Sequence, residues 1–143
     1  MDEAAAWMAR AAIAELITRY AALNDAGEWE ALAALYTEDG RMSRPTVPEE
    51  LISGRVAILD AFRSRPRRVS RHIVANVWVK LESDARACAT SQILLFTGRA
   101  ADDGGPPLLS SAAPLIGSYD DTLVKTAAGW RFHERRGRLD FRA

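Results

Sequence analysis

The chain has 143 residues, of which 48% are hydrophobic and 27% charged, so it suits a single globular domain with a real core over residues 1–143. Lysine plus arginine equals aspartate plus glutamate at 19 each, and this zero net charge argues against nucleic acid as the main partner, because phosphate binding needs a basic excess. The single cysteine, Cys88, excludes an intrachain disulfide and a cysteine-rich zinc site. No apolar run suffices for a signal peptide or a membrane span, so we expect a soluble, cytoplasmic protein with no membrane partner.

The first part of the chain has the apolar periodicity of helices. Ile13, Leu16 and Tyr20 recur at helical spacing in an alanine-rich stretch, and the cluster at residues 24–27 is typical of a turn that ends a helix. In chain order, we predict a helix over residues 3–23, a shorter helix over 28–36, a short strand over 41–44, a loop containing Pro45 and Pro48, and a third helix after Gly54.

The second part of the chain alternates as β-strands do. The stretch 70–82 is rich in β-branched and aromatic residues and contains no glycine or proline, and its alternation puts on one face His72, Val74, Asn76 and Trp78. Further strands are predicted over 85–99, 114–126 and 129–141, with a flexible loop over 101–112. Helices first and long strands later predict an α+β fold, in which three N-terminal helices pack on a strongly curved antiparallel sheet that encloses a pocket.

A histidine on an apolar strand face needs a polar partner, and we expect His72 to pair with Asp25, far away in the sequence. A carboxylate fixes the tautomer of an imidazole and stabilises its cation, while the free ring nitrogen takes a proton near neutral pH. We therefore predict Asp25 and His72 as catalytic residues. The predicted substrate-binding residues are the neutral donors Tyr20, Asn76 and Tyr119 and the apolar walls Trp29, Val74, Trp78, Leu94 and Phe96.

These residues also have purely structural interpretations. Asp25 fits a capping box with Glu28 at the start of the second helix, and His72 alone fits a satisfied core histidine. The arginines between residues 63 and 71 are interpreted as a solvated rim, or alternatively as a contact for an anion or a partner. With only two histidines we expect no metal site, and without a glycine-rich phosphate loop or a nucleophile elbow we expect no cofactor.

Three parts of the sequence together resemble one family, in order and at matching spacing. They are the run from Ile13 through Tyr20 and Asp25 to Gly40, the motif Arg71-His72 with Asn76, and the closing residues 117–121 and 129–136. These parts resemble SnoaL-like proteins of the NTF2-like superfamily, which implies a cystatin-like cone for nearly the whole chain. Within that superfamily the site is similar to that of scytalone dehydratase and hexachlorocyclohexane dehydrochlorinase, which implies catalytic roles for Asp25 and His72.

The sequence also departs from both of these enzyme families. Tyr20 stands where the dehydrochlorinase has a lysine. The second pocket histidine of scytalone dehydratase has no clear counterpart, because His133 is predicted on the opposite face of the last strand from Trp130 and Phe132. Neither substrate is therefore carried over to this chain.

The resemblance implies a cofactor-independent lyase, of dehydratase or dehydrohalogenase type, or an isomerase, acting on a small, cyclic, largely apolar ligand, either aromatic or alicyclic. The alternative is a non-catalytic ligand-binding or structural subunit, similar to the small subunit of ring-hydroxylating dioxygenases. Because the strands carry apolar residues on both faces and the helices can cover only one, we also expect a homo-oligomer, either a dimer or a trimer.

Overall fold

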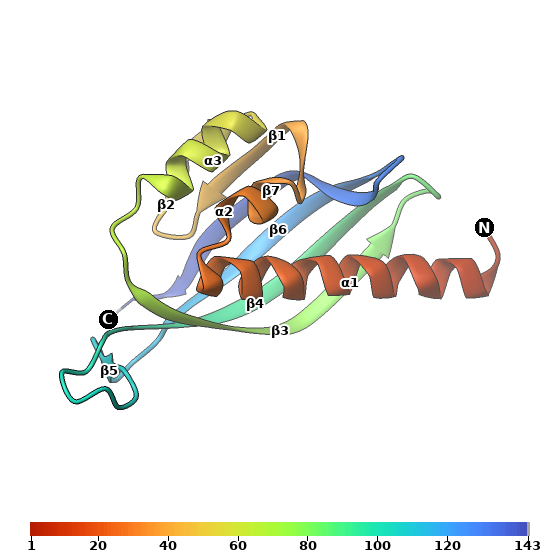
Figure 1. The fold of residues 1–143 in the computed structure, drawn as a ribbon. Coiled ribbons are helices and arrows are strands. Elements are labelled where there is room, and N and C mark those ends of the chain that lie inside the picture. Colours follow the sequence, from red (N-terminus) through yellow and green to blue (C-terminus); the bar gives the residue numbers. More distant parts are fainter. Residues whose placement is uncertain (143) are drawn as a thin grey trace.

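The computed structural model describes residues 1–142, which form helices packed on one face of a sheet of long strands (Figure 1). The helices are α1 (Glu3–Ala26), α2 (Trp29–Ala33) and α3 (Arg55–Arg63). The strands are β1 (Tyr36–Arg44), β2 (Val47–Ser53), β3 (Val69–Leu81), β4 (Arg86–Arg99), β5 (Leu108–Leu109), β6 (Leu115–Thr126) and β7 (Gly129–Phe141). None of the described helices is long and apolar enough to cross a membrane.

Both ends of α1 are capped, and the second cap sets the position of Asp25. The Asp2 side chain accepts the N–H of Ala5 at 2.7 Å, which satisfies one of the free donors of the first turn. At the other end, Gly27 adopts a left-handed conformation with φ of 71°, and its N–H bonds to the carbonyl of Asn24. The helix therefore continues slightly further than predicted and carries Asp25 in its last turn.

The sheet is mixed, with the strand order β2-β1-β7-β6-β4-β3 and the short β5 paired to β4. All its pairings are antiparallel except that of β1 with β7, which is parallel. The prediction of a strongly curved, wholly antiparallel sheet is therefore wrong in both respects, since the sheet is not strongly curled either. The strands β1 and β7 lie far apart in the sequence, so no tight hairpin turn forces them to run antiparallel.

The hairpin of β1 and β2 replaces several predicted elements. Tyr36, the last residue of the predicted second helix, starts β1, and the predicted loop is the second half of this hairpin, which turns at Pro45 and Thr46. Tyr36, the first residue of β1, is completely buried. Pairing with β7 satisfies the backbone of β1, and this tertiary gain outweighs the local turn preference of residues 37–40.

A bulge divides β3 into two halves that present opposite alternation. Asn76 has φ of 52°, and the register with β4 shifts between Ala75 and Trp78. Before the bulge, His72 faces the helices, whereas after it Trp78 faces outward and is 72% exposed. The predicted shared face of His72 and Trp78 is therefore wrong, because one extra residue reverses the alternation.

The hydrophobic core lies between the helices and the inner face of the sheet. Helix α1 lies along β3, while α3 packs on β1 and α2 (Figure 1). The predicted apolar stripe of α1 is buried in this core. The largest fully buried apolar side chains are Tyr36, Phe62, Phe132, Ile13, Ile17, Leu32, Ile58 and Leu123.

Candidate active site

The Asp25 carboxylate is held by donors from the start of β3. Its Oδ1 lies 2.5 Å from His72 Nδ1 and accepts the Ser70 hydroxyl at 2.9 Å, while its Oδ2 accepts the backbone N–H of His72 at 2.8 Å. The two side chains that were predicted to pair are thus within hydrogen-bond distance. Asp25 does not cap α2, because its position in the last turn of α1 aims the carboxylate at β3, and the N-cap residue Glu28 makes no side-chain cap bond.

The pairing determines which nitrogen of His72 is free. A carboxylate is an acceptor, so Nδ1 carries the hydrogen toward Asp25, and Nε2 is left with its lone pair. Burial lowers the pKa of His72 below its ordinary value, and the nearby Asp25 opposes this effect without cancelling it. The imidazole is therefore neutral at neutral pH, which is the form that accepts a proton.

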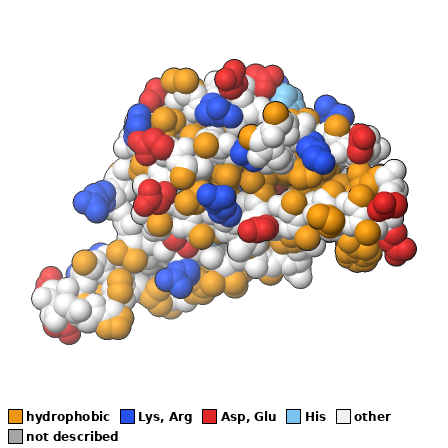
Figure 2. Space-filling model, turned by 45° about the vertical axis from the view of Figure 1, so that its right-hand side comes forward, with side chains coloured by type: hydrophobic (Ala, Val, Ile, Leu, Met, Phe, Trp, Pro, Cys, Tyr) orange, Lys and Arg blue, Asp and Glu red, His pale blue; other side chains and the backbone are white. Residues whose placement is uncertain are grey.

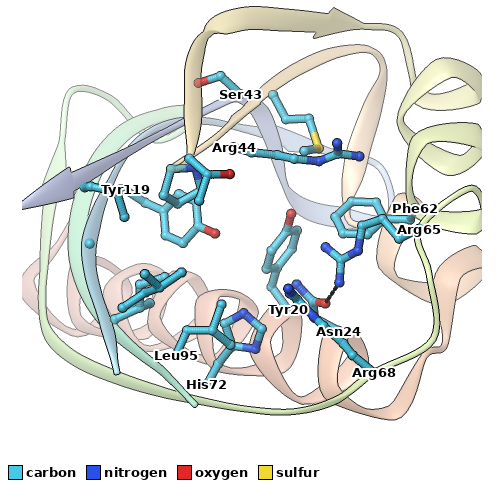
Figure 3. A pocket seen from close by; sticks show the side chains of 17 residues that line it. Tyr20, Asn24, Ser43, Arg44, Phe62, Arg65, Arg68, His72, Leu95 and Tyr119 are labelled. Carbon is cyan, nitrogen blue, oxygen red and sulfur yellow. Dashed lines mark hydrogen bonds between the residues drawn. The ribbon is translucent and has the colours of Figure 1, made fainter. Parts of the chain in front are cut away.

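His72 lines a cavity of about 240 Å³ between α1, α3, β1 and the inner face of the sheet (Figure 3). Two of the predicted substrate-binding residues, Tyr20 and Tyr119, line the same cavity. Asp25 lies behind His72 and is not part of the lining. The apolar part of the wall comprises Met42, Phe62, Ile93, Leu95, Leu115 and Leu139.

The tyrosines of the cavity are protonated donors. Burial raises the pKa values of Tyr20 and Tyr119, so their hydroxyls keep their hydrogens at neutral pH. Tyr36, which lies outside the lining, donates its hydroxyl hydrogen to the Tyr20 oxygen over 3.1 Å. Because Tyr20 accepts that bond, its own hydrogen remains available to a ligand in the cavity.

A buried ion pair supports the two tyrosines from behind. Arg135 Nε lies 3.0 Å from Asp121 Oδ1, and both side chains are almost completely buried. The guanidinium carbon of Arg135 lies 3.8 Å from the ring centre of Tyr119 and 4.4 Å from that of Tyr20. Burial raises the pKa of Asp121 to about 6, against the opposing charge of Arg135. The sequence analysis did not predict this pair. The signal that could have found it is that Asp121 lies two residues after Tyr119 and therefore on the same face of the strand.

Six of the predicted substrate-binding residues lie outside the cavity lining, namely Phe96 and the five that follow. Trp29 stacks on Phe62 with ring centres 5.3 Å apart, and Val74 packs against the core. At the bulge, Asn76 donates to Gln92 Oε1 at 2.5 Å on the outer side of the sheet. Trp78 is exposed there as well. Leu94 lines an outer groove.

On β4 the predicted face was the wrong one. Ile93 and Leu95 line the cavity, whereas the predicted residues Leu94 and Phe96 do not. The run from Ile93 to Phe96 is continuously apolar, so its sequence alternation could not distinguish the inner from the outer face.

Three arginines that were not among the predicted site residues line the cavity. They are Arg44 from β1 and Arg65 and Arg68 from the segment between α3 and β3 (Figure 3). The interpretation of the arginines at 63–71 as a solvated rim is wrong for Arg65, which is half-buried, whereas Arg68 is exposed and also lines the cavity. The side chain of arginine is long and flexible, so the position of its guanidinium cannot be predicted from helix or strand periodicity. Only the clustering of arginines in the sequence could have pointed to these residues.

Helices packed on one face of a mixed sheet form the cystatin-like fold of NTF2-like proteins. Residues 6–136 match the SnoaL-like domain, which is most of the chain, and the protein therefore belongs to the SnoaL-like family. The predicted family membership is confirmed.

Solved structures support this assignment. A proposed scytalone dehydratase from Novosphingobium aromaticivorans is 25% identical with a TM-score of 0.78, and the match covers 98% of this chain and 89% of that one. An NTF2-like protein with a cystatin-like fold from the same species is 26% identical with a TM-score of 0.75, covering 96% and 85%. A hexachlorocyclohexane dehydrochlorinase shares the fold at 16% identity and a TM-score of 0.79, covering 98% and 90%. A comparison with curated proteins found no match.

Proposed function

We propose that the protein is a cofactor-independent lyase, of dehydratase or dehydrohalogenase type, or an isomerase that acts on a small, cyclic, largely apolar compound. The single observation that carries this proposal is the pairing of His72 with Asp25 over 2.5 Å, with the histidine on the wall of a cavity. A neutral imidazole with an oriented tautomer is a competent general base near neutral pH.

The proposed reaction begins with proton abstraction from a carbon next to an electron-withdrawing group. His72 Nε2 takes the proton, and the Asp25 carboxylate stabilises the resulting imidazolium. Tyr20 or Tyr119 donates a hydrogen bond to the oxygen on which negative charge develops, and burial makes that bond stronger than it would be in water. The electron pair then expels a leaving group in a lyase, or takes the proton back at another carbon in an isomerase.

The structural neighbours supply independent support for the lyase form. Two of them carry elimination reactions in their names, one as a proposed dehydratase and the other as a dehydrochlorinase. An elimination and an isomerisation share their first step, which is the abstraction of a proton from carbon, so both reactions need the same base.

A proton-exchange experiment tests the proposal without knowledge of the natural substrate. 2-Tetralone is a cyclic ketone with exchangeable α-protons, and nuclear magnetic resonance in heavy water follows their loss. We expect the wild type to accelerate exchange and His72→Ala to lower that rate by about 10²- to 10⁴-fold. His133→Ala is the matched control, because His133 lies on β7 near Asp39, away from the cavity.

Equal exchange rates in wild type and His72→Ala would contradict the proposed base. Binding of cyclic ligands without any exchange or turnover would instead favour the alternative of a non-catalytic subunit. Co-purification with a larger iron–sulfur subunit would support that alternative directly.

A further inference from the structure

The arginines that line the cavity form no ion pair within the described residues. Among residues 1–142, the lining of the cavity contains no aspartate or glutamate. Other arginines of the described chain do form ion pairs, such as Arg63 with Glu30 and Arg41 with Glu134, but Arg44, Arg65 and Arg68 form none within the described residues. The cavity therefore concentrates positive charge on the side opposite the apolar walls of β4 and β6.

Neutral contacts hold two of these guanidinium groups in place. Arg65 Nη2 donates to Asn24 Oδ1 at 3.1 Å, and its guanidinium carbon lies 5.4 Å from the ring centre of Trp29 and 5.0 Å from that of Phe62. Arg44 Nη2 donates to the carbonyl of Ala61 at 3.1 Å, while its buried Nε has no hydrogen-bond partner in the described structure. Both groups retain unused donors.

Placing like charges close together in a partly buried site without a counterion is unfavourable, and it affects the pKa of Arg65. Burial, followed by the charges of Arg68 and Arg44, lowers the pKa of Arg65 to about 10. A guanidinium presents planar donors that match the two oxygens of a carboxylate. An anionic group in the cavity would satisfy these donors and relieve the repulsion.

We propose that the substrate of this cavity carries a carboxylate, which Arg44, Arg65 and Arg68 bind, while its ring lies on the apolar wall. That this ligand is a substrate rests on the proposed function. The present proposal adds an anionic group to the largely apolar ring of that substrate. A carboxylate suits the site better than free phosphate, because the cavity also has the apolar surfaces of Leu95 and Leu115 to bury.

The probe for this proposal is benzoate, compared with the neutral benzamide and with inorganic phosphate. Isothermal titration calorimetry at neutral pH and low salt should show that benzoate binds at least about tenfold more tightly than benzamide, because hydrogen bonds to charged groups are the stronger ones. Benzoate should also bind more tightly than phosphate. Equal affinity for benzoate and benzamide, tighter binding of phosphate, or no binding of benzoate would overturn the proposal.

Matched substitutions locate the binding site. Arg65→Gln and Arg68→Gln should each weaken benzoate binding by about tenfold or more while leaving benzamide binding nearly unchanged. Arg67→Gln removes the same charge from an exposed neighbour that does not line the cavity, and it should have little effect. Arg68 is exposed, so its replacement tests the proposal even if Arg65→Gln fails to fold. An equal loss in Arg67→Gln would overturn the assigned site.

The His72→Ala variant separates this proposal from the catalytic one. Benzoate binding needs the arginines and not the base, so His72→Ala should still bind benzoate within a fewfold of wild type. If benzoate binding depends on Arg65 but proton exchange does not depend on His72, the proposed anion site is supported and the proposed catalysis is contradicted. If proton exchange depends on His72 but benzoate binding does not depend on Arg65, the proposed catalysis is supported and the proposed anion site is contradicted.

Discussion

At the scale of single residues, the function of Asp25 depends on what its two oxygens accept. They bond to the side chain and the backbone N–H of His72 and to the Ser70 hydroxyl. An asparagine has only one oxygen, so Asp25→Asn should leave one of these donors unpaired and the imidazolium unsupported. We expect activity to fall by about 10²- to 10⁴-fold, as measured by kcat in the exchange assay. A near-silent substitution would assign Asp25 a structural role alone.

The pH dependence of the protein should reflect the lowered pKa of His72. Because burial places the folded-state pKa below that of the unfolded chain, the unfolded state binds the proton first as the pH falls through the ordinary range near 6.5. This histidine therefore contributes stability that is present above that range and is lost in more acidic solution. Activity should likewise persist to a lower pH than an unperturbed histidine would allow.

Urea unfolding of wild type and His72→Gln at several pH values measures this contribution. The difference in unfolding free energy between the two proteins should change below about pH 6.5, since only the wild type can take up the proton at this position. The difference between the two proteins is needed because Asp121, whose pKa is raised to about 6, makes the unfolding free energy change with pH in the opposite direction over the same range. This contribution is the same in both proteins and cancels. A constant difference across the range would contradict the lowered pKa of His72.

At the scale of elements, the bulge in β3 allows one strand to place His72 in the site before the bulge and apolar side chains against the core after it. Asn76 holds the left-handed conformation that reverses the alternation, and asparagine tolerates it better than most residues do. Asn76→Gly should leave stability nearly unchanged, whereas Asn76→Val should cost about 1–3 kcal/mol of unfolding free energy. Denaturant unfolding of the two variants checks this. Equal losses would indicate that the side-chain bond to Gln92, and not the backbone, maintains the bulge.

At the scale of the whole molecule, the face of the sheet away from the helices has exposed apolar side chains. Ile73, Trp78 and Phe141 are exposed there, Trp78 by 72% and Phe141 by 67%, and the half-buried Leu94 and Ile116 line the outer groove beside them. In the view of Figure 2, which is turned by 45° from that of Figure 1, acidic and basic side chains are interspersed with hydrophobic ones. We propose that this outer face joins copies of the chain into a dimer or trimer.

Size-exclusion chromatography with light scattering tests this assembly. The wild type should be a dimer or trimer at micromolar concentration, and Trp78→Ser should shift it toward monomer because a large exposed apolar side chain is removed from this face. Met8→Ser is a suitable control, since Met8 is equally exposed but lies on α1. A monomeric wild type, or an equal shift in both variants, would contradict the proposed interface.

The sequence by itself determined the elements with long regular periods. The stripe on α1 and the alternation of the four long strands predicted their places within a few residues, and the motifs around Asp25 and His72 predicted the family and the pairing of these two side chains. These features are local, because a side chain's place on a helix or strand follows from the spacing of its neighbours.

Only the tertiary structure decided the direction of β1, the bulge at Asn76, the inner face of β4 and the direction of the cavity arginines. Each depends on a partner far away in the sequence. Strand β1 takes its direction from β7, and the apolar run on β4 has an inside only because α1 and α3 cover one face. Arg44, Arg65 and Arg68 meet because distant elements enclose the same cavity, and local periodicity carries no information about such a meeting.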